Sequence, residues 1–126
     1  MKNIINSNKA PEPIGPYNQA IMTDNVLYIS GQIGINRETG ILVNDDINAE
    51  TTQVMNNLGA ILHEANLHYS NIVKCTIYVS DLKYFADINK VYGSYFKENH
   101  PAREIAQVEK LPLNANVEIS AIAVKN

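Results

Sequence analysis

One arginine and one glutamate stand in strand-like stretches where a charged side chain is unusual. Arg103 lies in HPAREIAQVEKLP, on the same strand face as Ile105. Glu118 lies in VEISAIAV, whose apolar residues on both faces are typical of a central, covered strand. A guanidinium presents a planar fork of donors that matches a carboxylate. A glutamate buried in such a strand acquires the shifted pKa that suits acid–base chemistry.

Both residues also have a purely structural interpretation, and the sequence alone leaves it open. Arg103 could be a surface arginine in an exposed ion pair, an interaction that contributes little to stability. Glu118 could stand at the edge or the end of its strand and face the solvent, where an unpaired carboxylate costs nothing.

Two short stretches could complete a site around these charges. In Gly15-Pro-Tyr17, the glycine permits unusual backbone angles and the proline fixes the next φ, so that the tyrosine is aimed in one direction. In the pair Ser30 and Gly31, a glycine inside a strand indicates a bulge or the close approach of another group. A packed strand tyrosine and an ordinary bulge remain the structural alternatives.

A third candidate interrupts the apolar stripe of a helix. Asn89 shares that stripe with Phe85, Tyr92 and Phe96, and a buried amide needs hydrogen-bond partners. Asn89 therefore either caps a loop or faces a cleft.

Other kinds of chemistry lack their residues. The three histidines, at 63, 68 and 100, do not share the spacing of metal ligands, so no metal site is predicted. Cys75 alternates with Val73 and Ile77, which favours a small core residue over a nucleophile. There is no Gly-rich phosphate loop and no nucleophile-elbow motif.

Hydrophobic periodicity predicts the elements that position these residues. Alternation indicates strands and a 3.6-residue period indicates helices, in the order strand, strand, a short third strand, helix, strand, helix, strand, strand. We predict an α+β two-layer domain over residues 1–126, with a mixed β-sheet and both helices on one face. The strands are expected at 17–22, 26–33, 41–43, 71–80, 103–109 and 115–124, and the helices at 48–66, capped by Asn48, and 82–98, capped by Asp81.

Composition limits the function classes. A chain of 126 residues is one ordinary domain, and a net charge of −3 with a pI of about 5.5 does not attract nucleic acid. The single cysteine fits a reducing compartment, and neither a signal peptide nor a membrane span is recognisable, so we expect a cytoplasmic protein. The second face of the sheet also carries apolar residues, which predicts a closed homo-oligomer.

Five stretches, in this order, make the whole chain resemble one family. They are APEPIGPYNQA, LYISGQIGINRETG, VKCTIYVSDLKYFADINKVYGSYF, PAREIAQVEKLP and VEISAIAV. Together they resemble the Rid family (YjgF/YER057c/UK114), the reactive-intermediate deaminases, and in particular its archetypal RidA-like members. The resemblance implies a chorismate-mutase-like fold and a homotrimer, with the sheets forming a central barrel and ligand clefts lying between subunits.

The resemblance also implies an activity and a set of roles. Members hydrolyse 2-aminoacrylate and related imines, such as 2-iminobutanoate and 2-iminopropanoate, which pyridoxal-phosphate dehydratases release, to 2-keto acids and ammonia without a cofactor. The family's carboxylate-binding arginine corresponds to Arg103, its acidic residue to Glu118, and its GPY tyrosine to Tyr17. The remaining site positions fall on Ser30, Gly31 and Asn89.

Two positions depart from the archetypal pattern, in which serine and cysteine follow the arginine. Glu104 is expected on the opposite strand face, away from the site. Ile105 shares the face of Arg103, offers no thiol, and is bulky enough to narrow the cleft or to exclude longer substrates. The alternative functions are therefore a non-catalytic trimer that binds a keto acid or amino acid for regulation, and a ribonuclease or translation inhibitor, against which the net charge argues.

Overall fold

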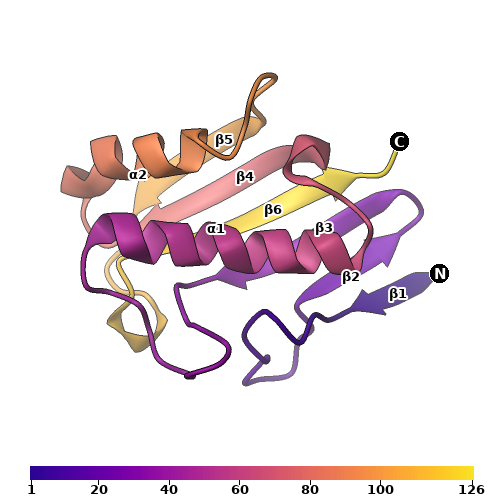
Figure 1. Cartoon of the computed structure of the whole chain (residues 1–126), viewed down its shortest axis with the longest axis horizontal. Helices are drawn as coiled ribbons and strands as arrows, with labels where there is room; N and C mark the ends of the chain where they lie inside the picture. Colours follow the sequence, from indigo (N-terminus) through magenta and orange to yellow (C-terminus); the bar gives the residue numbers. More distant parts are fainter.

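Two helices cover one face of a six-stranded sheet, in a computed structural model that describes all residues from 1 to 126 (Figure 1). The strands are β1 (Lys2–Ile5), β2 (Ala20–Thr23), β3 (Val26–Gln32), β4 (Ile72–Val79), β5 (Ala102–Gln107) and β6 (Val117–Val124), and the helices are α1 (Ile47–Glu64) and α2 (Phe85–Gly93). The order across the sheet is β1-β2-β3-β6-β4-β5, and only the β4–β5 pair is parallel. The predicted α+β architecture with a mixed sheet is confirmed.

The central strand β6 shows how alternation creates two faces. Its odd-numbered residues, from Val117 to Ala123, are buried under the helices, and its even-numbered residues, from Glu118 to Val124, are half-buried on the opposite face. The buried faces of β3 and β4 and the apolar stripes of α1 and α2 join them in one core of 22 residues. Burial of this apolar surface is the main force that holds the two layers together.

The helices differ from their predicted bounds mainly at their ends. Helix α1 is capped by Asp46, whose carboxylate accepts a hydrogen bond from the Ala49 N–H at 2.7 Å, so the prediction of Asn48 as the cap is wrong. Asp81 caps the second helical segment as predicted, with an acceptor contact of 2.8 Å to the Lys83 N–H. That segment is one 3₁₀ turn over 82–84 followed by α2, which ends at Gly93 rather than at residue 98.

The predicted strands differ from the structure in three places. No strand was expected before residue 17, yet β1 pairs with β2 as an antiparallel edge strand. The stretch 41–43 forms only a single bridge, between Ile35 and Leu42. In β4, an irregular register between Ile72 and Lys74 turns Ile72 into the core and leaves Val73 47% exposed, which reverses the faces expected for these two residues.

The sheet face away from the helices carries apolar side chains. Tyr28 of β3 and Tyr78 of β4 are exposed there, and Ile122 of β6 lies half-buried between those two strands. An uncovered face of this kind is typical of an interface. Neither helix is both long and apolar enough to cross a membrane.

Candidate active site

The first group of candidate residues surrounds Arg103 on the helix-covered face of the sheet. Arg103 stands on the edge strand β5 directly opposite Cys75 of β4, whose side chain is fully buried. One guanidinium nitrogen (Nη1) donates a hydrogen bond of 2.6 Å to the side-chain carbonyl oxygen of Asn89 on α2. The guanidinium carbon lies 5.2 Å from the ring centre of Tyr92 and 5.8 Å from that of Phe85.

These contacts hold the arginine without neutralising it. Aromatic faces attract a guanidinium, and the amide oxygen of Asn89 orients it. The two ion pairs of the protein join Arg37 to Glu12 and Lys74 to Glu104, so Arg103 has no carboxylate partner. The alternative of a surface arginine in an ion pair is therefore wrong. The guanidinium keeps donors with which it can bind an anion.

Cys75 lies beneath this arginine but is not a nucleophile of the site. Its side chain is fully buried in the core, as predicted. Burial raises the pKa of the Cys75 thiol, although the nearby Arg103 charge lowers it in part. The thiol is therefore neutral and packs as a small apolar group.

The two departures after the arginine fall on different faces. Glu104 lies opposite Thr76 of β4, and its carboxylate pairs with the Lys74 ammonium at 3.1 Å on the face away from the helices. Ile105 lies opposite the buried Ile77 and packs against the core, on the same face as Arg103. Glu104 thus stays clear of the Arg103 group, as predicted.

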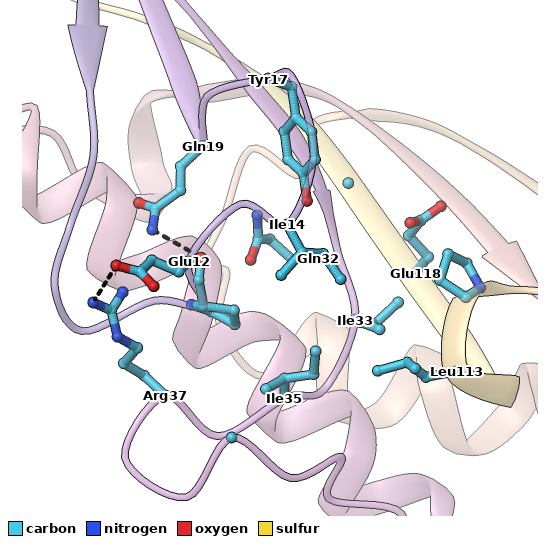
Figure 2. Close-up of a pocket in the computed structure, with 14 residues that line it drawn as sticks. Glu12, Ile14, Tyr17, Gln19, Gln32, Ile33, Ile35, Arg37, Leu113 and Glu118 are labelled. Atoms are coloured by element: carbon cyan, nitrogen blue, oxygen red, sulfur yellow. Dashed lines mark hydrogen bonds and ion pairs between the residues drawn. The ribbon is translucent and has the colours of Figure 1, made fainter.

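The second group lines a pocket of about 530 Å³ (Figure 2). Tyr17, Gly31 and Glu118, which the sequence singled out, meet there. Figure 2 shows the Tyr17 hydroxyl pointing into the pocket, with Glu118 at one end and Arg37 at the other. The remaining lining residues are Pro11, Glu12, Ile14, Gln19, Gln32, Ile33, Ile35, Gly40, Pro112 and Leu113.

Gly31 leaves room for the Glu118 side chain, which lies directly over it. A Cβ atom at position 31 would stand 2.8 Å from the carboxyl carbon of Glu118 and 3.0 Å from one of its oxygens. The register between β3 and β6 shifts between Ile29 and Gln32, so the predicted irregularity at this glycine is confirmed. Burial raises the pKa of Glu118, and no salt bridge to a cation offsets this effect.

Tyr17 is positioned by a tight turn and by a buried glutamine. The Tyr17 N–H donates to the Gly15 carbonyl at 2.8 Å, which closes a three-residue turn over the predicted Gly-Pro-Tyr stretch. Two residues later, the buried amide of Gln19 donates to the carbonyls of Ser7, Ala10 and Pro11 at 3.0, 3.3 and 2.9 Å. The chain on both sides of Tyr17 is thus fixed.

Ser30 is tied to the backbone rather than presented to the pocket. Its hydroxyl donates to the Asn18 carbonyl at 2.7 Å, and its N–H donates to the Gln19 carbonyl at 2.8 Å. It does not line the pocket, although its neighbour Gly31 does. In a single chain, Ser30 therefore supports the loop that carries Tyr17.

The two groups lie on opposite faces of the sheet. Arg103 is opposite Cys75, Glu118 is opposite Tyr78, and residues three apart on β4 point to opposite faces. Two strand spacings and three residues along a strand put the Cα atoms of Arg103 and Glu118 roughly 14 Å apart. One chain therefore does not bring Arg103 and Asn89 to the same small molecule as Glu118.

Several residues of the pocket were missed by the sequence reasoning. Ile33, Ile35 and Leu113 form its apolar walls from loops that lack a strand or helix period. The only signal for Leu113 is its place in a turn just before Glu118. No group of three or more histidine, cysteine, aspartate or glutamate side chains is arranged to hold a metal ion.

Fold and site together define an α+β protein with a small-molecule pocket beside a carboxyl of raised pKa. Residues 7–125 match the family model described as Endoribonuclease L-PSP. The chain is 50% identical over 123 residues to a RutC family protein of Aquifex aeolicus, covering 96% of this chain and 98% of that protein. It is 41% identical over 125 residues to the 2-iminobutanoate/2-iminopropanoate deaminase of Homo sapiens, covering 99% and 91%.

A solved structure shows the same fold. The structure of E. coli TdcF with bound serine matches with a TM-score of 0.95 and 35% identity, covering 98% of this chain and 99% of that one. The chain therefore belongs to the Rid/YjgF/L-PSP family, as its motifs predicted. The human relative is named as an imine deaminase, so hydrolysis of C–N bonds is an activity of this family.

Proposed function

We propose that this protein hydrolyses 2-iminobutanoate, 2-iminopropanoate and similar imines to 2-keto acids and ammonia. The observation that carries the proposal is the carboxyl of Glu118, which lies over Gly31 in an apolar pocket with a raised pKa. A carboxyl whose pKa is raised in this way is suited to accepting and donating protons in a reaction. An arginine without an acidic partner supplies the matching site for the substrate carboxylate.

The proposal requires two copies of the chain at each site. Because Arg103 and Glu118 of one chain lie on opposite sheet faces, the arginine of one copy must approach the pocket of a neighbour. The apolar sheet face with Tyr28 and Tyr78 supports this assembly, since burial of that face would stabilise a closed oligomer. A trimer with the sheets inside, as the family resemblance implies, would form three equivalent sites.

Substrate binding would depend on the Arg103 group. Two guanidinium N–H groups would grip the substrate carboxylate while Asn89 and the rings of Phe85 and Tyr92 keep the guanidinium still. A fixed carboxylate orients the neighbouring C=N bond toward Glu118 and removes rotational freedom before the reaction. Ile105, on the same face as Arg103, would limit the width of this entrance.

The chemistry needs one water molecule and a proton carrier. The carboxylate of Glu118 accepts a proton from water as the water oxygen bonds to the imine carbon, and it then passes this proton to the imine nitrogen, which gives a carbinolamine. In the second half, Glu118 accepts the proton of the carbinolamine hydroxyl and delivers it to the nitrogen. The C–N bond breaks, ammonia leaves as the C=O bond forms, and Glu118 is again a carboxylate. The Tyr17 hydroxyl, which points into the pocket, would hydrogen-bond the reacting groups.

A regulatory binding protein is the second candidate. The bound serine in TdcF and the presence of Ile105 instead of a thiol favour it. The name of the family model favours ribonuclease activity, but the net charge of −3 argues against binding of a polyanion. For imine hydrolysis, the functional partners would be cytoplasmic pyridoxal-phosphate dehydratases that release the imines.

The proposal is tested by hydrolysis of freshly generated 2-iminopropanoate. A serine dehydratase would supply it, and the loss of imine absorbance would be followed with the wild type, Arg103→Ala and Lys90→Ala. Lys90→Ala is the matched control, because it removes an exposed cation from the same helix as Asn89. We expect Arg103→Ala to lose about two charge-assisted hydrogen bonds, each worth roughly 1.5–3 kcal/mol, and therefore nearly all activity.

The outcomes separate the candidate functions. Acceleration by the wild type and Lys90→Ala, but not by Arg103→Ala, supports the deaminase. If the wild type binds 2-oxobutanoate in calorimetry but does not accelerate imine hydrolysis, the protein is a binding protein and the proposed function is wrong.

A further inference from the structure

An exposed leucine is held at the pocket in an unfavourable backbone conformation. Leu113 has φ 55° and ψ 25°, in the left-handed region that disfavours side chains with a Cβ, and the next residue, Asn114, also has a positive φ of 56°. The leucine side chain is nevertheless 60% exposed. Neither burial nor backbone preference accounts for a leucine here, and such strained positions are concentrated at functional sites.

The turn that carries Leu113 is anchored on both sides. Leu111 before it and Ala115 after it are buried, and the Ala115 N–H closes the turn on the Pro112 carbonyl at 3.1 Å. The next residue, Asn116, donates from its backbone and its side chain to the buried carboxylate of Glu50, at 2.7 and 2.9 Å. Leu113 therefore projects from a fixed frame.

The pocket provides an apolar surface opposite this leucine. Figure 2 shows Leu113 below Glu118 on the same side of the pocket, with Ile33 and Ile35 beside it and Arg37 on the far side. The pocket has a volume of about 530 Å³ in one chain, and the neighbouring copy that brings Arg103 to Glu118 would take part of this space. The aliphatic side chains beside Glu118 are suited to contact an apolar group that extends from the reacting carbon.

The far end of the pocket does not offer a free charge. The Arg37 guanidinium donates to the Ala10 carbonyl at 2.6 Å and pairs with the Glu12 carboxylate at 3.6 Å. A charged side chain of a ligand would compete with these contacts and would cross the apolar walls first. Ile33, Ile35 and Leu113 lie in the lining together with the uncharged polar side chains of Gln19 and Gln32, so a neutral side chain fits this part of the pocket better than a charged one.

We propose that Leu113 is a specificity-determining residue, which contacts the side chain of the substrate and favours 2-imino acids with branched or extended aliphatic side chains over 2-iminopropanoate. The inference rests on the proposed imine hydrolysis and adds to it the substrate class and the residue that selects it. The walls at Ile33 and Ile35 would hold the opposite side of the same aliphatic group.

The test compares two imines on three proteins. A flavin amino-acid oxidase would generate the imines of leucine and alanine, and kcat/KM for each would be measured with the wild type, Leu113→Asn and Ile4→Asn. Asparagine tolerates the left-handed region better than leucine, so Leu113→Asn removes apolar surface without adding backbone strain. Ile4→Asn makes the same kind of change at an exposed position on β1 that does not line the pocket.

We expect the wild type and Ile4→Asn to prefer the leucine-derived imine. Leu113→Asn should lose about tenfold in kcat/KM for that imine, the effect of one or two methylene contacts, and change less than about twofold for the alanine-derived imine. Thermal unfolding should show that Leu113→Asn is at least as stable as the wild type. Equal loss for both imines, or an unchanged preference, overturns the role of Leu113.

A parallel measurement keeps this test separate from the proposed function. Calorimetry would give the affinities for 4-methyl-2-oxopentanoate and pyruvate, the keto acids that correspond to the two imines. If no imine is hydrolysed faster than in buffer, the proposed function is wrong, and the keto-acid affinities alone decide about Leu113. Tighter binding of the branched acid that is lost in Leu113→Asn supports the inference, and equal affinities overturn it.

Discussion

Replacing Gly31 by alanine should lower the rate of imine hydrolysis and leave the stability of the fold nearly unchanged. The new Cβ would stand 2.8 Å from the carboxyl carbon of Glu118, whereas ordinary contact begins at 3.4 Å, so the carboxyl must move by at least about 0.6 Å (3.4 − 2.8). The carboxyl is the mobile end of a long side chain, and it can turn away. A displacement of about 1 Å in a catalytic group can cost on the order of 10²-fold in rate.

The stability of this variant should change little. Gly31 does not have the positive φ that makes alanine strained, and alanine restricts the unfolded chain, which is worth about 0.4–1 kcal/mol. We therefore expect a free energy of unfolding within about 1 kcal/mol of the wild type. The measured loss should lie in kcat for imine hydrolysis.

The matched control is Gly93→Ala at the end of α2, where a Cβ meets no atom within 4 Å. Imine hydrolysis and urea unfolding would be measured on both variants, and Gly93→Ala should keep full activity. A Gly31→Ala protein with the kcat of the wild type refutes the placement of Glu118 at the reacting centre. If the Gly31→Ala protein is inactive because it is unfolded, Gly31 is needed for the fold and not for the chemistry.

Two further substitutions test the half-buried carboxyl of Glu118 and the buried carboxyl of Glu50. Burial raises the pKa of Glu118 in the folded state, so its ionisation destabilises the fold as pH rises from the usual glutamate range through that raised pKa. Glu118→Gln should therefore be more stable than the wild type at neutral pH and equally stable in acid, and it should be inactive. If the urea midpoint of the variant does not rise above that of the wild type as pH increases, this prediction is wrong. Asn116→Ala removes the 2.9 Å side-chain donor to the buried Glu50 carboxylate and should cost about 2 kcal/mol, and an unchanged urea midpoint would show that this contact contributes nothing.

Much of the fold follows from the sequence because burial imposes a period. The alternation in β6 and the stripes of α1 and α2 are strong enough to locate these elements within a few residues. The edge strand β1 was not predictable in this way, since a short exposed strand carries little alternation. The reversal of Ile72 and Val73 depends on an irregular register, which local composition does not specify.

The sequence indicated which residues belong to the candidate site, but it did not indicate how they are arranged relative to one another. Arg103, Glu118 and Tyr17 stand out because charged or rigidly held polar groups are rare in such stretches. That Arg103 and Glu118 face opposite sides depends on which strands pair and in what register, and this is a property of the whole sheet. The turn that places Leu113 in the pocket wall is anchored by a contact between Asn116 and Glu50, which are 66 residues apart in the sequence.

The central claim is that Arg103 of one copy and Glu118 of another make one active site. The most direct test mixes Arg103→Ala with Glu118→Gln in equal amounts, unfolds the mixture in urea and refolds it together. Each site needs an intact arginine from one chain and an intact glutamate from its neighbour, so random assembly gives intact sites in about a quarter of cases. We predict about a quarter of the wild-type rate of imine hydrolysis from the mixture and none from either variant treated alone. A mixture as inactive as its two components would contradict the account.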